Sequence, residues 1–211
     1  TGTGADNTNV TMGHGLGVTP DFVWVKNRSS GLSRVWHKNL SSDSTYNIKN
    51  LIMSNSNAED GYGSQIRDIG ASTFTVRDVD ANGNLSVNKS GDSYIAYCFS
   101  EVAGYSKFGK YTGNGNANGT FVHLGFRPAF VITRGLHGTS WYTYDNKRNT
   151  NNVVDKELNP NNNQSEATFT TMDFLSNGFK LRTSNDAFNY NNYTYIYLAF
   201  AESPFKYSRA R

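Results

Sequence analysis

The feature that most constrains the fold of this 211-residue chain is a repeated apolar run. Residues 94–101 read YIAYCFSE, and residues 195–202 read YIYLAFAE. A Tyr/Phe/Lys-rich stretch follows the run in both places. Self-similarity over a long period indicates that each copy is one structural unit.

Further blocks repeat in the same order. Residues 1–27 match residues 112–134, FTVR at 74–77 matches FKLR at 179–182, and GYSKFGKY matches PFKYSRAR. The aligned pairs are Pro20 with Pro128, Phe22 with Phe130, Val23 with Val131, Trp36 with Tyr144, and His37 with Asp145. We therefore expect a duplication, with a first repeat at residues 1–109 and a second at 110–211 that superpose strand for strand.

Local patterns predict β-structure throughout. Short β-branched and aromatic runs such as DFVWVKN and AFVITR follow a proline, and Asn-Gly turns separate many of the runs. We expect an all-β protein of two tandem antiparallel β-sandwich repeats, although one larger sandwich built from both copies would fit the same pattern. The runs YIAYCF and YIYLAF predict central strands covered on both faces, and residues 152–159 could form one helical turn. The predicted core includes Phe22, Phe99, Phe130, Ile196 and Phe200.

Composition excludes several classes of protein. The net charge is only +3, and basic residues are scattered among 17 acidic ones, which argues against a nucleic-acid-binding surface. The single cysteine, Cys98, cannot form an internal disulfide and is expected to be a small buried residue. No run is long and apolar enough for a transmembrane helix, and no cofactor motif occurs. Because the chain opens without Met, we expect it to be a piece of a longer protein.

Together these blocks resemble a tandem repeat domain in tail-fibre and other appendage proteins of tailed bacteriophages. The blocks that carry the resemblance include GHGLGVTPDFVWVKN, SYIAYCFSEVAGYSKFGKYTGNG, DFLSNGFKLR and YIYLAFAESPFKYSRAR. The resemblance implies a concanavalin-like or jelly-roll sandwich in an extracellular virion structural protein. It also implies a host-surface glycan or receptor and other virion proteins as partners, and a homotrimeric parent fibre. It supplies no catalytic residues.

The segment TSWYTYDNKRN is the best candidate for binding a ligand. A sugar site needs a flat aromatic face and planar polar groups, and Trp141, Asp145 and Arg148 could provide both. Alternation along a strand places Trp141 and Asp145 on one face, with Tyr144 on the opposite, core-facing side. His37 occupies the matching place in the first repeat and is a weaker candidate.

One passage partly matches a calcium loop. Asp78, Asp80 and Asn82 occupy its first three ligand positions, but Lys89 stands where a bidentate glutamate is required. A hairpin that turns at Asn82-Gly83 explains the same residues. Calcium is therefore a weak hypothesis, and no metal is expected.

Catalytic motifs are missing from the sequence. Concanavalin-like glycosidases carry paired carboxylates on one strand, and no such pair occurs. Glu101 and Glu202 follow the two repeated runs and are expected to bind nearby basic residues. We favour a non-catalytic appendage module that acts as a spacer, a receptor-binding tip or both. The alternatives are a fragment of a polysaccharide depolymerase and a secreted bacterial lectin-like domain.

Overall fold

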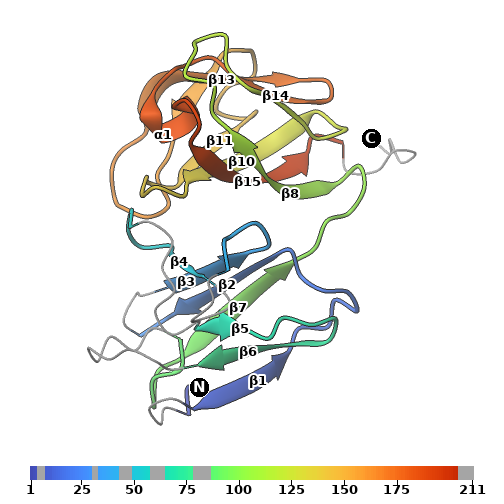
Figure 1. The fold of residues 1–211 in the computed structure, drawn as a ribbon, viewed down its shortest axis with the longest axis vertical. Helices are drawn as coiled ribbons and strands as arrows, with labels where there is room; N and C mark the ends of the chain where they lie inside the picture. Colours follow the sequence, from blue (N-terminus) through green and yellow to red (C-terminus); the bar gives the residue numbers. More distant parts are fainter. Residues whose placement is uncertain (4–7, 30–32, 43–48, 58–64, 78–86, 204–211) are drawn as a thin grey trace. The chain divides into compact units, whose positions relative to one another are not determined.

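The computed structural model describes residues 1–3, 8–29, 33–42, 49–57, 65–77 and 87–203. These residues form four antiparallel sheets, which confirms the all-β prediction (Figure 1). Their helical structure is limited to the short α1 (Asp186–Asn189). Part of the segment that could have formed a helical turn is instead strand β12 (Val154–Glu157).

The chain divides into two compact units, residues 1–100 (unit 1) and residues 101–211 (unit 2). The sequence placed this boundary at 109/110, inside strand β8 (Ser106–Thr112). The division falls earlier because β8 pairs along its whole length with β15 (Thr194–Ala201) and so belongs to the second unit.

Unit 1 contains two sheets that share one core. Val23 and Val25 from one sheet pack with Ile66, Phe74 and Val76 from the other. The first sheet has the order β4 (Leu51–Ile52), β3 (Ser33–His37), β2 (Phe22–Asn27), β7 (Tyr94–Phe99), and the second has β1 (Asn9–Gly13), β6 (Thr73–Arg77), β5 (Ile66–Arg67).

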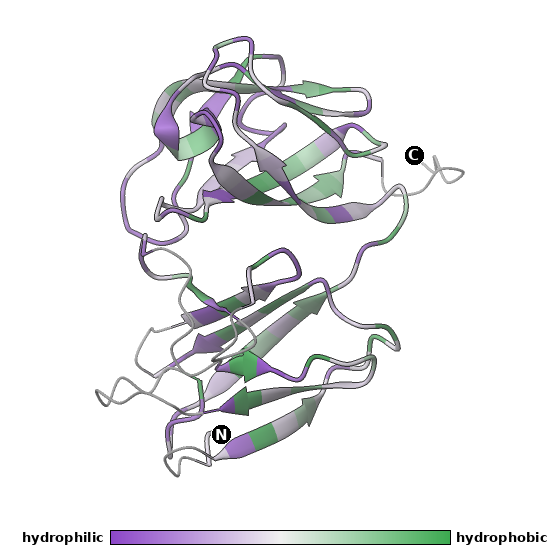
Figure 2. Ribbon diagram, viewed as in Figure 1, coloured by the Kyte–Doolittle hydropathy of each residue, from purple (hydrophilic) through white to green (hydrophobic). Residues whose placement is uncertain are grey.

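Unit 2 likewise contains two sheets that share one core, and each of its sheets has four strands. Figure 2 shows that hydrophobic residues of this unit lie mainly on its strands. Side chains at alternate positions along these strands contribute to a common core. The core includes Tyr144, Tyr195, Met172, Phe174 and Phe179. One sheet has the order β11 (Tyr142–Asp145), β10 (Pro128–Gly135), β15, β8, and the other has β12, β13 (Ala167–Leu175), β14 (Gly178–Leu181), β9 (Phe121–His123).

Strand registers follow the sequence alignment of the two copies. The matched pairs across strands are Phe22 with His37 and Phe99 in unit 1, and Phe130 with Asp145 and Phe200 in unit 2. Likewise, Met12 lies opposite Phe74 and Val122 lies opposite Phe179. Aligned residues therefore have corresponding strand partners in the two units.

The two repeated apolar runs differ in their surroundings. Strand β15 lies between β10 and β8 and is buried, as predicted. Strand β7 ends its sheet among the described residues, and Ile95 and Tyr97 are 40% and 38% exposed, so the prediction of a covered central strand is wrong there. Of the predicted core, Phe22 and Ile196 are buried, whereas Phe99, Phe130 and Phe200 are only half-buried.

Truncating Phe179 should destabilise the protein more than truncating Phe200. Phe179 is fully buried against Tyr111 and Tyr197, so Phe179→Ala should cost about 3–5 kcal/mol through lost transfer energy and a cavity. Half-buried Phe200 should cost less. Urea unfolding followed by circular dichroism measures both, and an equal or greater loss in Phe200→Ala would contradict this assignment of the core.

Candidate functional site

The segment singled out in the sequence is divided by the fold. Strand β11 separates the turn at His137-Gly138 from the group at Asp145–Arg148, so the two lie at opposite ends of that strand. Trp141 has no exposed surface and packs beneath the Arg134 guanidinium, 4.9 Å from the ring centroid. The indole therefore offers no exposed face on which a sugar could stack.

His37 is also buried. Its Nδ1 accepts a hydrogen bond from the backbone N–H of Asn39 at 3.1 Å, and its ring meets the edge of Phe22 at 6.4 Å. These contacts give His37 a structural role at the end of β3. The calcium candidates Asp78, Asp80 and Asn82 lie outside the described residues.

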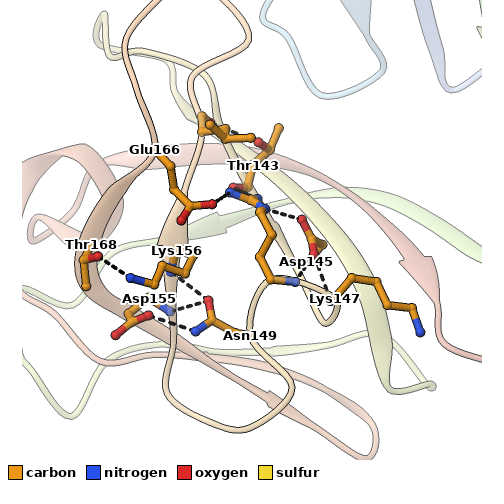
Figure 3. Close-up of polar contacts among 10 residues, drawn as sticks. Thr143, Asp145, Lys147, Asn149, Asp155, Lys156, Glu166 and Thr168 are labelled. Carbon is orange, nitrogen blue, oxygen red and sulfur yellow. Dashed lines mark hydrogen bonds and ion pairs between the residues drawn. The ribbon is translucent and has the colours of Figure 1, made fainter.

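Asp145 and Arg148 form a closed polar network at the end of β11 (Figure 3). The Asp145 carboxylate accepts from the backbone N–H groups of Lys147 and Arg148 at 2.9 and 2.8 Å, and from Arg148 Nε at 2.6 Å. Arg148 also donates to the Thr143 carbonyl at 3.0 Å and pairs with Glu166 at 3.3 Å. These groups bind one another and stabilise the turn.

The same network continues to the neighbouring strands. The Asn149 side chain donates to Asp155 at 2.9 Å and accepts from the backbone N–H of Lys156 at 2.7 Å. Lys156 Nζ in turn reaches Thr168 Oγ1 on β13 at 2.7 Å (Figure 3). The DNKRN segment, which ends β11 and forms the loop after it, is thus linked by hydrogen bonds to β12, which is linked in turn to β13.

Exposed aromatic rings gather at the other end of β11. His137, Tyr190 and Tyr193 form what we call the aromatic surface. The Tyr193 ring lies 4.3 Å from His137 and 4.9 Å from Tyr190, measured between centroids. Tyr190 and Tyr193 are 49% and 41% exposed. Exposed asparagines, including Asn191 and Asn192, adjoin the two tyrosines in sequence.

A hydrogen-bonded frame fixes the loops beneath this surface. The buried Asn189 donates to Asn114 Oδ1 and to the carbonyls of Asn116 and Thr183, each at 2.8 Å. Its own Oδ1 accepts from the backbone N–H of Asn114 at 3.0 Å. At Gly113 a Cβ would lie 2.2 Å from the Tyr190 carbonyl, so only glycine fits. The Gly/Asn-rich loop is therefore an ordered part of the surface.

Unit 1 builds the same frame without the rings. Gly2 N donates to the Asp92 carbonyl at 2.8 Å, and Lys89 N donates to Tyr94 Oη at 2.9 Å. The matching bonds in unit 2 run from Gly113 N to the Tyr193 carbonyl at 2.9 Å, and from Tyr190 N to Tyr195 Oη at 2.9 Å. Lys89 and Asp92 thus occupy the places of Tyr190 and Tyr193.

The exposed Asp186 lies beside the aromatic surface and acts electrostatically on His137 and on Tyr195. Burial raises the pKa of Tyr195, which lies behind the exposed rings, to about 12. Burial also lowers the pKa of His137, against a weaker raising effect of Asp186, so the imidazole is neutral at pH 7. The rings and the neighbouring asparagines suit a ligand with apolar C–H faces and hydroxyl groups.

Sequence reasoning missed the tyrosines because they stand in the run AFNYNNYTY, which has the composition of an ordinary loop. Alignment of the two repeated segments could have found them, because Tyr190 and Tyr193 align with Lys89 and Asp92. Loop residues that differ between otherwise similar segments are candidates for binding. Among the described residues, no group of three or more His, Cys, Asp or Glu side chains could hold a metal ion.

Replacing Asp145 should change the acid sensitivity of the fold. Burial opposes the charge on Asp145, but the hydrogen bonds from Arg148 and Lys147 outweigh it and leave the pKa lowered. Its stabilising contribution is therefore present above the unfolded pKa of about 3.9 and is lost as pH falls through the lower folded value. At pH 7, Asp145→Asn should be less stable than the unmodified chain by about 1 kcal/mol. Urea unfolding should show this difference shrinking below about pH 4, and a difference independent of pH would refute the assignment.

Comparisons with known proteins identify a family but no function. Residues 1–204 match a family described as "Domain of unknown function (DUF7483)", which spans nearly all of both units. No curated protein and no solved structure matches the chain. In the part of the chain that the structure describes, no helix has the length and apolar character needed to cross a membrane. The chain thus belongs to the DUF7483 family.

Proposed function

We propose that this chain is a non-catalytic module of a tailed-bacteriophage appendage, such as a tail fibre, that binds a host-surface glycan through the aromatic surface of unit 2. Its place is in the extracellular virion. Other virion proteins are its structural partners, and the parent fibre is a homotrimer. The blocks of sequence that resemble phage appendage repeats support this assignment.

We further propose that the units are tandem β-sandwich repeats of jelly-roll or concanavalin-like type. The corresponding strand registers and the two matched loop frames support a common origin. In each unit two antiparallel sheets enclose a single core, as in a sandwich.

The observation that carries the binding function is the difference between the two loop frames. Both units use the same backbone bonds, so the fold does not require aromatic side chains at these positions. Unit 2 nevertheless places Tyr190 and Tyr193 there, substantially exposed, where unit 1 has Lys89 and Asp92. Exposed aromatic rings on an ordered frame provide contact area at a low entropic cost.

The chemistry of the surface fits a saccharide. The flat ring faces of the tyrosines can stack against the C–H face of a pyranose. The adjoining asparagine amides can both donate hydrogen bonds to hydroxyl groups and accept them. A single site of this kind binds at about millimolar Kd, and several copies in one fibre would raise the avidity.

The acidic residues support a binding role over hydrolysis. Asp145 is held by Lys147 and Arg148, and Glu202 pairs with Arg127 at 3.0 Å. Glu101 lines a groove of about 640 Å³ in unit 2, where its Oε1 accepts from the Phe108 N–H at 2.9 Å. A glycosidase requires two carboxyl groups facing one bond.

Removing either ring should weaken glycan binding without unfolding the protein. We expect Tyr190→Ala and Tyr193→Ala each to weaken glycan binding at least about tenfold, which corresponds to about 1.4 kcal/mol. The matched control is Phe121→Ala, which removes a ring that is 42% exposed on β9. Binding of the purified chain to glycan arrays and to bacterial cells is the measurement, with circular dichroism as the test of folding.

Folded tyrosine variants that bind as well as the unmodified chain would refute the aromatic surface. Loss of binding in Phe121→Ala alone would place the site on β9 instead. Release of reducing sugars from a bound polysaccharide would favour the depolymerase alternative.

A further inference from the structure

The clearest difference between the two units lies at the edge of β7. In unit 2 the matching strand β15 pairs with β8 on one side and β10 on the other. In unit 1, β7 pairs with β2, and no further strand of the described residues lies beyond it. We call the stretch from Ile95 to Cys98 the open edge.

The open edge is unlike a natural sheet edge. Exposed edge strands are normally protected by charged residues, proline or a bulge, because they otherwise pair with other chains. Strand β7 reads YIAYCF and contains none of these, and Ile95 and Tyr97 are well exposed. Its composition is that of a strand with partners on both sides.

A groove runs beside the open edge. It has a volume of about 390 Å³ and is lined by Gly13, His14, Phe74, Ala96, Tyr97, Cys98 and Phe99. Phe74 aligns with Phe179, which in unit 2 packs against Tyr111 of β8 at 6.0 Å and Tyr197 of β15 at 5.6 Å. Ala96 aligns with Tyr197. The groove therefore lies beside Phe74 in the place where, in unit 2, the rings of Tyr111 and Tyr197 cover Phe179.

The N-terminus lies at the end of this edge. In unit 2 the residue before Gly113 is Thr112, the last residue of β8, which pairs with Thr194. Gly2 occupies the equivalent place in unit 1, with the matching bond to the Asp92 carbonyl. A polypeptide joined ahead of Thr1 would therefore enter along β7 as β8 does along β15.

We propose that the open edge of β7 and its groove accept an antiparallel strand joined directly ahead of Thr1. This strand completes the sheet of unit 1 as β8 completes the sheet of unit 2. Since β8 itself follows unit 1 in the chain, units of this kind are linked in series, each completed by the strand that precedes it. The inference rests on the proposed duplication and is independent of glycan binding.

The groove also specifies the incoming strand. Gly109 of β8 faces Tyr197, and a Cβ there would lie 2.5 Å from the tyrosine hydroxyl. Ala96 leaves that space empty in unit 1. The strand accepted by β7 should therefore carry a larger apolar side chain at the position of Gly109.

The test joins a copy of residues 101–111 to Thr1 of the full chain. Three extensions are compared: the unchanged copy, a copy with Gly109→Leu, and a control copy with Phe108→Pro and Lys110→Pro, which cannot form the ladder. The probe is the rate at which Cys98, the single cysteine and a lining residue of the groove, reacts with a thiol reagent. Light scattering reports the oligomeric state, and circular dichroism reports folding.

Compared with the chain without an extension, we expect the unchanged copy to slow the reaction of Cys98 about tenfold while the protein stays a monomer. The leucine copy should slow the reaction further, and the proline copy should not change it. Equal rates in all three folded proteins would overturn the proposal. Protection that appears only in dimers would show that the strand comes from a second molecule, which also overturns it. Glycan binding through Tyr190 and Tyr193 should be the same in all three, so this proposal and the proposed function fail separately.

Discussion

The pairing of the apolar strand β15 on both edges is the constraint on which the rest of unit 2 depends. Its buried backbone needs partners on two sides, and β10 and β8 supply them. The inward face of β15 builds the core through Tyr195 and Tyr197. Tyr195 also stacks on Tyr111 at 5.0 Å, and its hydroxyl accepts the N–H of Tyr190. One strand thus joins the core to the loop frame that presents the aromatic surface.

Under the proposed duplication, a common loop frame with different exposed residues separates structure from function. The Gly and Asn positions of the frame are required by close backbone approach and by buried hydrogen bonds. The positions of Lys89 and Asp92 in unit 1 carry Tyr190 and Tyr193 in unit 2, although Asp92 also accepts a hydrogen bond from the buried Asn27 at 2.8 Å. The proposed division is that unit 2 binds the ligand and unit 1 extends the module.

The sequence predicted the positions of strands better than it predicted burial. Aligned blocks and β-branched and aromatic runs anticipated strands at residues 22–27, 94–99, 128–135 and 194–201, because strand propensity and alternation are local patterns. The partners of these strands, such as Phe99 opposite Phe22, came from the structure. Burial depends on neighbours that are distant in sequence, so Trp141 was expected at the surface and β7 was expected to be covered. The aromatic surface was missed because its residues come together from two loops.

Nuclear magnetic resonance of the chain with isotope-labelled tyrosine rings tests whether Tyr190 and Tyr193 contact the glycan. During titration with a host-surface polysaccharide, the ring signals of Tyr190 and Tyr193 should shift first and saturably. The signals of Tyr97 and Tyr105, exposed elsewhere on the chain, should stay constant. Shifts confined to those other tyrosines, or no shift with a polysaccharide that the chain demonstrably binds, would show that the aromatic surface is not the binding site.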